Sequence, residues 1–318
     1  MRIVLAAEEA AGLQAVRLVI GSPHRLHAVL TGSRAGDRTR GVTVASAARA
    51  LSVPVLPADL VKDPRFADDL RREGVDVLLN VHSLHLVDAA VLAAPRVGCF
   101  NLHPGPLPEY AGLSVPSWAI YRGERRHAVT LHWMAADVDA GHVAYEAPLP
   151  ISDTDTGLSL SVACVREGLP LIERLLEDAR EDRIPAREQD LTRRRWHGPA
   201  SPHRGGLPWS MPARMVVNLV RASDYGPFRS PWGRPRTMAY EREFEVLAAK
   251  LTGLESEAAP GTVGDRDGGG VRVAAADEWV LVERVRDEQG TVPAADRLEP
   301  GLRLREPPPA TCDSRQES

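Results

Sequence analysis

The sequence predicts an α/β fold in which an open, mostly parallel sheet is followed by a small C-terminal β-barrel. Two observations carry this prediction. Between residues 2 and 151, short apolar runs alternate with segments of helical periodicity, which is typical of a sheet with helices on both faces. Beyond residue 213, short strand candidates punctuated by glycine follow one another, as they do in small barrels.

The individual elements are predicted from apolar runs and their spacing. The continuous run VDVLLNV at 75–81 is typical of a strand buried on both faces. Further extended segments are expected at 2–6, 27–32, 53–56, 97–103, 128–134 and 143–151. Helical spacing predicts helices at 9–20, 44–51, 63–74, 87–94, 114–124 and 155–182. Pro170 is expected to kink the last of these helices. The alternation predicts a Rossmann-like sheet.

Composition shifts divide the chain into parts. We expect a first domain at 1–192, a linker rich in Arg, Pro, Gly and Ser at 193–212, and the barrel domain at 213–305. The final segment 306–318, EPPPATCDSRQES, has the composition of a disordered tail.

The bulk composition indicates a cytoplasmic enzyme. A net charge of −4 does not fit a general nucleic-acid coat or a membrane-surface protein. No run of 18 apolar residues is present, and the acids Glu8 and Glu9 interrupt the apolar N-terminal segment. The three cysteines are far apart, so neither a disulfide framework nor a metal site is expected, and Cys99 and Cys164 are predicted to be reduced core residues.

A candidate catalytic set lies between residues 100 and 143. Asn101 and His103 are at the end of a predicted strand, and the following Pro-Gly-Pro fixes a rigid loop. Asp139 follows the next strand candidate. A carboxylate can orient a histidine and stabilise its charged form, and an Asn amide can donate to a developing oxyanion. Each residue alone would also fit an ordinary turn.

The same stretch resembles a known family. The segments FNLHPGPLPEYAG, SWAIYRGE and AVTLHWMAADVDAGHV resemble the N10-formyltetrahydrofolate-dependent formyltransferase superfamily, and the separation of 36 residues between His103 and Asp139 matches it. The resemblance extends to about residue 305. The segments LPWSMPARMVVNLVRASDYGP and EWVLVERV are similar to the linker and OB-like barrel of methionyl-tRNA formyltransferases.

The resemblance implies roles for particular residues. Asn101 would orient the formyl oxygen and stabilise the tetrahedral oxyanion, a protonated His103 would do so from the other side, and Asp139 would pair with His103 and help deprotonate the amine. No metal is implied. Folate would be bound by two loops, through Ser83, Leu84, His85, Leu86, Ala136, Asp137 and Val138. Leu84 and Leu86 could instead be core residues, and His82 and His85 are outside the family's catalytic pattern.

The acceptor is the open part of this hypothesis. The loop YAGLSVPSW differs from the Arg-Gly-Ala-Ala-Pro form of tRNA-acting members and resembles formylation domains of siderophore and peptide natural-product pathways. Segment 31–44 also lacks their longer basic loop, and a sugar-nucleotide-type Tyr-Leu-Pro-Tyr-Asn loop is absent. We therefore expect a small amine or amino acid such as hydroxyornithine, or a carrier-bound aminoacyl group.

Three alternatives remain. The first is a methionyl-tRNA formyltransferase. The segment from Arg204 to Arg242 has seven arginines and two acids, and such a basic stripe could contact the phosphates of a tRNA, although the arginines could also belong to a solvated linker. A non-catalytic binding protein would not need all three polar residues. A Rossmann dehydrogenase is disfavoured because no Gly-x-Gly-x-x-Gly follows the first strand.

Overall fold

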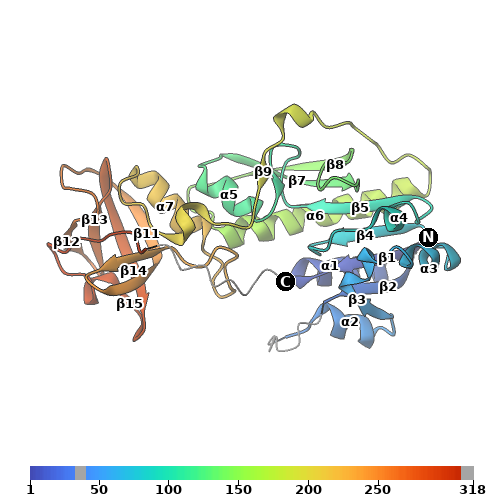
Figure 1. Cartoon of the computed structure of the whole chain (residues 1–318), viewed down its shortest axis with the longest axis horizontal. Helices are drawn as coiled ribbons and strands as arrows, with labels where there is room; N and C mark the ends of the chain where they lie inside the picture. Colours follow the sequence, from blue (N-terminus) through green and yellow to red (C-terminus); the bar gives the residue numbers. More distant parts are fainter. Residues whose placement is uncertain (33–40, 309–318) are drawn as a thin grey trace. The chain divides into compact units, whose positions relative to one another are not determined.

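The computed structural model describes residues 1–32 and 41–308, which form two compact units (Figure 1). The first unit contains Met1–Val115, Arg126–Pro150 and Ser161–His197, and the second contains Pro116–Arg125, Ile151–Leu160 and the chain from Gly198 onward. The predicted domain limits stay a prediction. The predicted tail lies outside the described residues from position 309 on, as do positions 33–40 of the segment that lacks the basic loop.

The first unit is built on a seven-stranded sheet with the order β3-β2-β1-β4-β5-β7-β8. The strands are β1 Arg2–Ala7, β2 Arg25–Thr31, β3 Val55–Pro57, β4 Val77–Val81, β5 Gly98–His103, β7 Arg126–Trp133 and β8 Val143–Pro150. The first five pair in parallel, whereas β7 is antiparallel to both β5 and β8. The expectation of an open, mostly parallel α/β sheet is therefore confirmed. A separate short parallel pair joins β6 Ala111–Gly112 to β9 Trp196–His197.

Helices follow the predicted periodicity closely. They are α1 Glu9–Gly21, α2 Val44–Ala50, α3 Phe66–Arg72, α4 Ala89–Leu92, α5 Val115–Tyr121, α6 Gly157–Ala179 and α7 Ala213–Ala222. The helix α6 runs on through Pro170 as a single element. None of the helices within the described ranges is long and apolar enough to cross a membrane.

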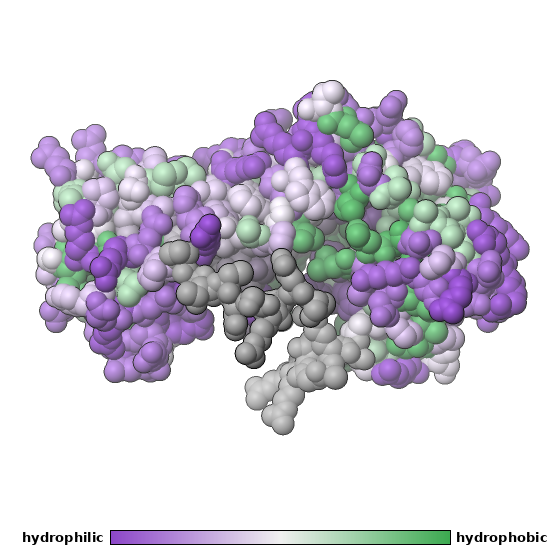
Figure 2. Space-filling view, in the orientation of Figure 1, coloured by the Kyte–Doolittle hydropathy of each residue, from purple (hydrophilic) through white to green (hydrophobic). Residues whose placement is uncertain are grey.

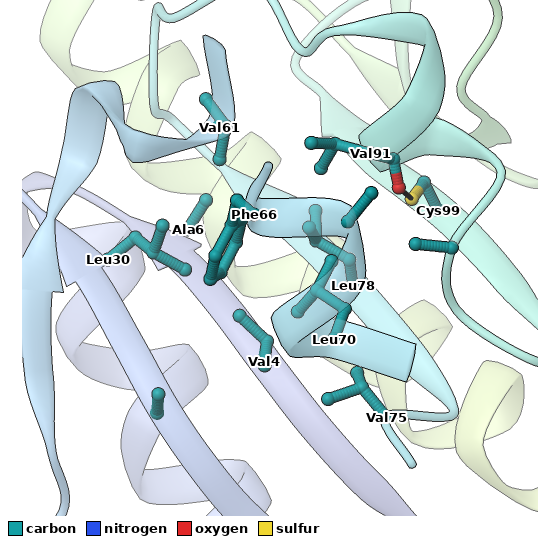
Figure 3. Close-up of a cluster of buried hydrophobic side chains, with 13 residues drawn as sticks. Val4, Ala6, Leu30, Val61, Phe66, Leu70, Val75, Leu78, Val91 and Cys99 are labelled. Carbon is teal, nitrogen blue, oxygen red and sulfur yellow. Dashed lines mark hydrogen bonds between the residues drawn. The ribbon is translucent and has the colours of Figure 1, made fainter. Parts of the chain in front are cut away.

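The core of the first unit explains why β1 is apolar at every position from Ile3 to Ala7. In β1, Val4 and Ala6 face one side of the sheet and pack with Phe66 and Leu70 of α3 (Figure 3). The alternating residues Ile3 and Leu5 are also fully buried, because α1 covers the opposite face. A central parallel strand with both faces covered needs apolar residues at consecutive positions.

The carboxyl ends of β4 and β5 lie side by side because these strands are parallel and in register, with Val81 opposite Leu102. The antiparallel β7 then places His132 opposite Asn101. The loop between β7 and β8 therefore returns toward the end of β5, so polar residues far apart in sequence meet there.

The second unit is an antiparallel barrel. Its strands are β10 Arg236–Ala239, β11 Arg242–Glu255, β12 Val263–Asp267, β13 Gly270–Ala274, β14 Glu278–Asp287 and β15 Gly290–Pro293. The sheet order is β10-β11-β14-β13-β12, with β15 beside β14. Residues 302–305 bond to both edges, through Val263 and Gly261 on one side and Met238 on the other. This last segment closes the sheet, which confirms the small C-terminal barrel.

Gly12 allows α1 to approach the end of β1, and its replacement tests this packing. A Cβ at Gly12 would lie 2.8 Å from the Cβ of Ala7 and 2.9 Å from its carbonyl carbon. We expect Gly12→Ala to lower the free energy of unfolding by about 1–3 kcal/mol, the usual cost of overpacking. Gly21→Ala, in the same helix with nothing within 4 Å, is the matched control and should not destabilise. Thermal or denaturant unfolding measures both variants, and equal stabilities would contradict the packing argument.

Candidate active site

Two of the predicted catalytic residues are placed by the end of β5. Asn101 and His103 are two positions apart in an extended strand, so their side chains point to the same face of the sheet. Leu102, between them, points to the other face and contacts α6 at Gly168. His103 is buried, and its Nε2 lies 2.6 Å from the carbonyl oxygen of Tyr110.

Asp139 joins these two residues from the loop between β7 and β8. Its carboxylate accepts a 2.9 Å hydrogen bond from the backbone N–H of Gly112. Asn101 Nδ2 lies 3.4 Å and His103 Nδ1 lies 3.6 Å from the same carboxylate. The structure thus brings all three predicted residues together around one buried carboxylate.

His132 is a fourth member of this cluster that the sequence reasoning missed. Its Nε2 lies 3.0 Å from Asn101 Nδ2 and 3.5 Å from Asp139 Oδ1. Its Nδ1 lies 2.8 Å from the carbonyl oxygen of Trp133, so a neutral ring donates there and accepts the Asn101 amide at Nε2. A signal was available, because Thr130 and His132 alternate with the apolar Val129 and Leu131 along a buried strand.

Asn80 is a second residue that the sequence reasoning missed. It is buried at the end of β4, and its Nδ2 donates to Asn101 Oδ1 at 3.1 Å. The bond fixes the Asn101 amide with its oxygen toward Asn80 and its NH2 group toward His132 and Asp139. Asn80 also bonds the backbone N–H and carbonyl of Ser83. A polar residue inside the apolar run VDVLLNV was the available signal.

The loop after β5 is held rigid by side chains of β7. Thr130 donates to the carbonyl of Gly105 at 2.7 Å, and His127 Nε2 lies 2.8 Å from the carbonyl of Pro104. Burial lowers the pKa of His127 to about 4, so this ring is neutral at pH 7 and serves as a hydrogen-bond donor. The predicted rigid presentation of His103 therefore has a defined cause.

Burial and charge oppose each other at His103 and Asp139. Burial is the largest influence on His103 and lowers its pKa, against the opposing effect of Asp139 and the Tyr110 carbonyl. For Asp139, burial would raise the pKa, but His103, His132 and the Gly112 N–H together bring it below its ordinary range. A neutral His103 therefore faces an ionised Asp139, which also accepts the hydrogen bond from the Gly112 N–H.

The predicted folate-binding residues lie on two loops beside this cluster. Leu84 and Leu86 are 76% and 65% exposed, which rules out the alternative that they are core residues. Ser83 is buried and His85 half-buried. Figure 2 shows a green, apolar area on the first unit around the region of β4 and β5. His82, just before Ser83, lies 3.4 Å from the carboxylate of Glu9 at the start of α1.

The second loop predicted to bind folate begins at Ala136. Ala136 and Asp137 are exposed, and Val138 is half-buried directly before Asp139. Both loops are thus connected to the cluster of Asn101, His103 and Asp139, the first through Asn80 and the second through the backbone.

Cysteine and metal chemistry have no support in the described part of the chain. Burial raises the pKa of the Cys99 and Cys164 thiols to about 12, so neither supplies a thiolate nucleophile near neutral pH. Within residues 1–32 and 41–308, no group of three or more His, Cys, Asp or Glu side chains is arranged to hold a metal ion.

Comparison with known proteins identifies the family of this chain. A family model described as formyl transferase matches residues 3–168, and one described as formyl transferase, C-terminal domain, matches residues 200–298. The chain belongs to the formyl transferase family. The predicted enzyme class is thereby confirmed, and Asn101, His103 and Asp139 all lie within the first matched region.

Solved structures share the fold of this formyltransferase at low sequence identity. An N-formyltransferase from Helicobacter canadensis, in complex with folinic acid and dTDP-3-aminofucose, is 12% identical with a TM-score of 0.65, covering 88% of this chain and 98% of that one. The sugar 3N-formyltransferase WlaRD is also 12% identical, with a TM-score of 0.66, and the match covers 88% of this chain and 96% of that one.

HypX from Aquifex aeolicus, in complex with tetrahydrofolic acid, is 18% identical with a TM-score of 0.62. The match covers 93% of the present chain but only 46% of HypX.

The opposing influences on His103 can be measured directly. We expect its imidazole to titrate below its ordinary pKa of about 6.5, because burial disfavours the charged ring. Asp139→Asn should lower this pKa further, since the substitution removes the carboxylate that stabilises the imidazolium. Histidine-selective NMR over a pH series measures both values, with His103→Gln to assign the resonance. A rise of the pKa in Asp139→Asn would contradict the described geometry.

Proposed function

We propose that this formyltransferase moves a formyl group from N10-formyltetrahydrofolate to the amine of a small, amino-acid-like acceptor or of a carrier-bound aminoacyl group. The proposal rests above all on the convergence of Asn101 and His103 with the buried carboxylate of Asp139, which lies 36 positions beyond His103 in the sequence. These are the residue types that an acyl transfer to an amine requires: an amide donor for the oxyanion and a paired base.

The geometry supports a division of roles. The amine attacks the formyl carbon, and the NH2 group of Asn101 exchanges its long 3.4 Å contact with Asp139 for a hydrogen bond to the oxyanion that develops on the formyl oxygen. The proton lost by the amine passes toward His103 and Asp139, where Tyr110 and Asp139 provide acceptors on both sides of the resulting imidazolium. The carbon–N10 bond then breaks, and N10 of the leaving tetrahydrofolate takes up the proton that His103 received from the amine. His103 is therefore neutral before attack, protonated in the tetrahedral intermediate and neutral again once tetrahydrofolate has left.

The folate donor is supported by the two loops beside the cluster. A pterin is flat and mostly apolar with a polar rim, and such ligands suit apolar walls combined with main-chain hydrogen bonds. Leu84 and Leu86 provide exposed apolar surface there. The Helicobacter canadensis enzyme and HypX, whose fold this chain shares, were solved with folinic acid and tetrahydrofolic acid respectively.

Charge pairing in the second unit favours a small acceptor over methionyl-tRNA. Four of the seven arginines between positions 204 and 242 form ion pairs within the unit, namely Arg214 with Asp153, Arg234 with Asp224, Arg236 with Glu243 and Arg242 with Asp287. Arg221 donates to the carbonyls of Ser152 and Asp155. Arginines that already have partners are poorly available to a phosphate backbone.

A panel of acceptors tests the substrate class. N10-formyltetrahydrofolate would be supplied with hydroxyornithine, other amino acids, a carrier-bound aminoacyl group, a dTDP-linked amino sugar and methionyl-tRNA, and formylated product would be read by mass. We expect the amino-acid-like amines to give the highest kcat/KM. A preference for methionyl-tRNA or for the amino sugar would overturn the proposed acceptor while leaving the formyl transfer itself intact.

Substitutions at the catalytic cluster test the proposed roles. We expect Asp139→Asn and His103→Gln each to lower kcat by a factor of about 10²–10⁴, because proton removal from the amine loses its acceptor. Binding of folinic acid, followed by calorimetry, should persist in both. Asp68→Asn on the exposed face of α3 is the matched control. Turnover close to that of the unsubstituted enzyme in either variant would refute the assignment of the cluster.

A further inference from the structure

The segment 185–197 lies across the loops that carry the catalytic cluster, and we name it the strap. Its end pairs in parallel with β6, so that Ala111 and Leu113 donate to the carbonyls of Arg195 and His197. Its beginning pairs with β8 through reciprocal backbone bonds between Arg187 and Val143. Part of this segment was predicted to be a linker. In the structure it is bonded to the first unit at both ends.

Gln189 of the strap holds the backbone around Asp139. Its side chain is buried, and Nε2 donates to the carbonyl of Asp139 at 3.0 Å and to that of Gly141 at 2.6 Å. Two carbonyl oxygens require a donor between them, so the amide orientation is determined. Oε1 has no hydrogen-bond partner in the described chain.

The carbonyl that Gln189 binds belongs to a backbone in an unusual conformation. Asp139 has a φ of 55°, in the left-handed region that residues with a side chain seldom adopt. A neighbouring constraint acts at Gly141, where a Cβ would lie 1.9 Å from the carbonyl oxygen of Trp133. Such conformations persist only where the surroundings hold them. Both hydrogen bonds from Gln189 act on this turn, which aims the Asp139 carboxylate at Asn101 and His103.

Arg194 of the strap holds the neighbouring part of the same loop. Its Nη2 donates to the carbonyl of Val138 at 2.7 Å, and its guanidinium carbon lies 5.5 Å from the ring centroid of Trp196. No acid pairs with Arg194 among the described residues. Val138 belongs to the loop that we propose to contact folate, so Arg194 acts on the donor side of the site and Gln189 on the catalytic side.

We propose that Gln189 and Arg194 are positioning residues with separate tasks: Gln189 fixes the Asp139 carboxylate for catalysis, and Arg194 fixes the Val138 segment for binding of the folate donor. This inference rests on the proposed function, since it uses the roles given there to Asp139 and to the folate loop. In this proposal, the strap is the segment that aligns the active-site residues.

Kinetics of matched variants separate the two tasks. Gln189→Met keeps the length of the side chain and removes the donor, and Gln189→Glu places a carboxylate against two carbonyl oxygens. We expect kcat to fall on the order of 100-fold in both, as for a misplaced catalytic group, with KM for N10-formyltetrahydrofolate little changed. Arg194→Met should raise that KM and weaken folinic acid binding by about tenfold, as for loss of a charge-assisted hydrogen bond, with kcat largely kept.

Controls separate positioning from folding. Gln14→Glu and Arg17→Met, both exposed on α1, should match the unsubstituted enzyme in every parameter. Thermal unfolding identifies any variant that does not fold at the assay temperature. Should Gln189→Glu fail in this way, Gln189→Met carries the test, because it introduces no charge.

The outcomes distinguish this inference from the proposed function. If Asp139→Asn abolishes turnover while folded Gln189→Met and Arg194→Met behave like the unsubstituted enzyme, the inference is wrong and the function stands. Equal changes of kcat and KM in both strap variants would also contradict it, because the tasks would then not be separate. If Asp139→Asn itself retains full turnover, the proposed function fails.

Discussion

The hydrogen bond from the Gly112 N–H to the Asp139 carboxylate is the contact on which the rest of the site depends. It joins the loop after β5 to the loop after β7, and without it the buried carboxylate would lose its shortest donor. Only glycine can supply it, because Gly112 has a φ of 101° and a Cβ there would lie 2.2 Å from the carbonyl oxygen of His197. The strand β9 is thus close enough to fix Gly112, and Gly112 in turn fixes Asp139.

The same burial that protects this carboxylate lowers the pKa of His103 beside it. A buried imidazole prefers to be neutral, and the cluster holds one carboxylate to offset the charge of any proton taken up. His103 has an acceptor at each ring nitrogen, so the imidazolium is well solvated by protein atoms once it forms. The His103 ring is therefore neutral at rest, and its surroundings stabilise the imidazolium when it forms. This suits a group that takes up a proton during one step of a reaction.

The sequence predicted those parts of the structure that depend on local patterns. Apolar runs identify β1, β4 and β5, and a separation of two residues places Asn101 and His103 on one face. The sequence marks Asn80 and His132 as polar residues in buried strands, but it does not show that His132 lies opposite Asn101. That pairing depends on the antiparallel direction of β7, which no local pattern specifies. Gln189 and Arg194 were missed for a similar reason. They lie in a segment without periodicity, and their importance comes from carbonyl groups on a distant loop.

The closure of the barrel by residues 302–305 has a consequence for the order of folding. Met238 bonds to Arg305 from the opposite end of the barrel sequence, so the contact that pairs the β10 edge has a large sequence separation. Contacts of this kind form slowly because a long loop must close first. The parallel strands of the first unit are connected by short helices and can pair while the chain is still being made. Until residue 305 has left the ribosome, β10 and β12 stay open edges that another chain could extend.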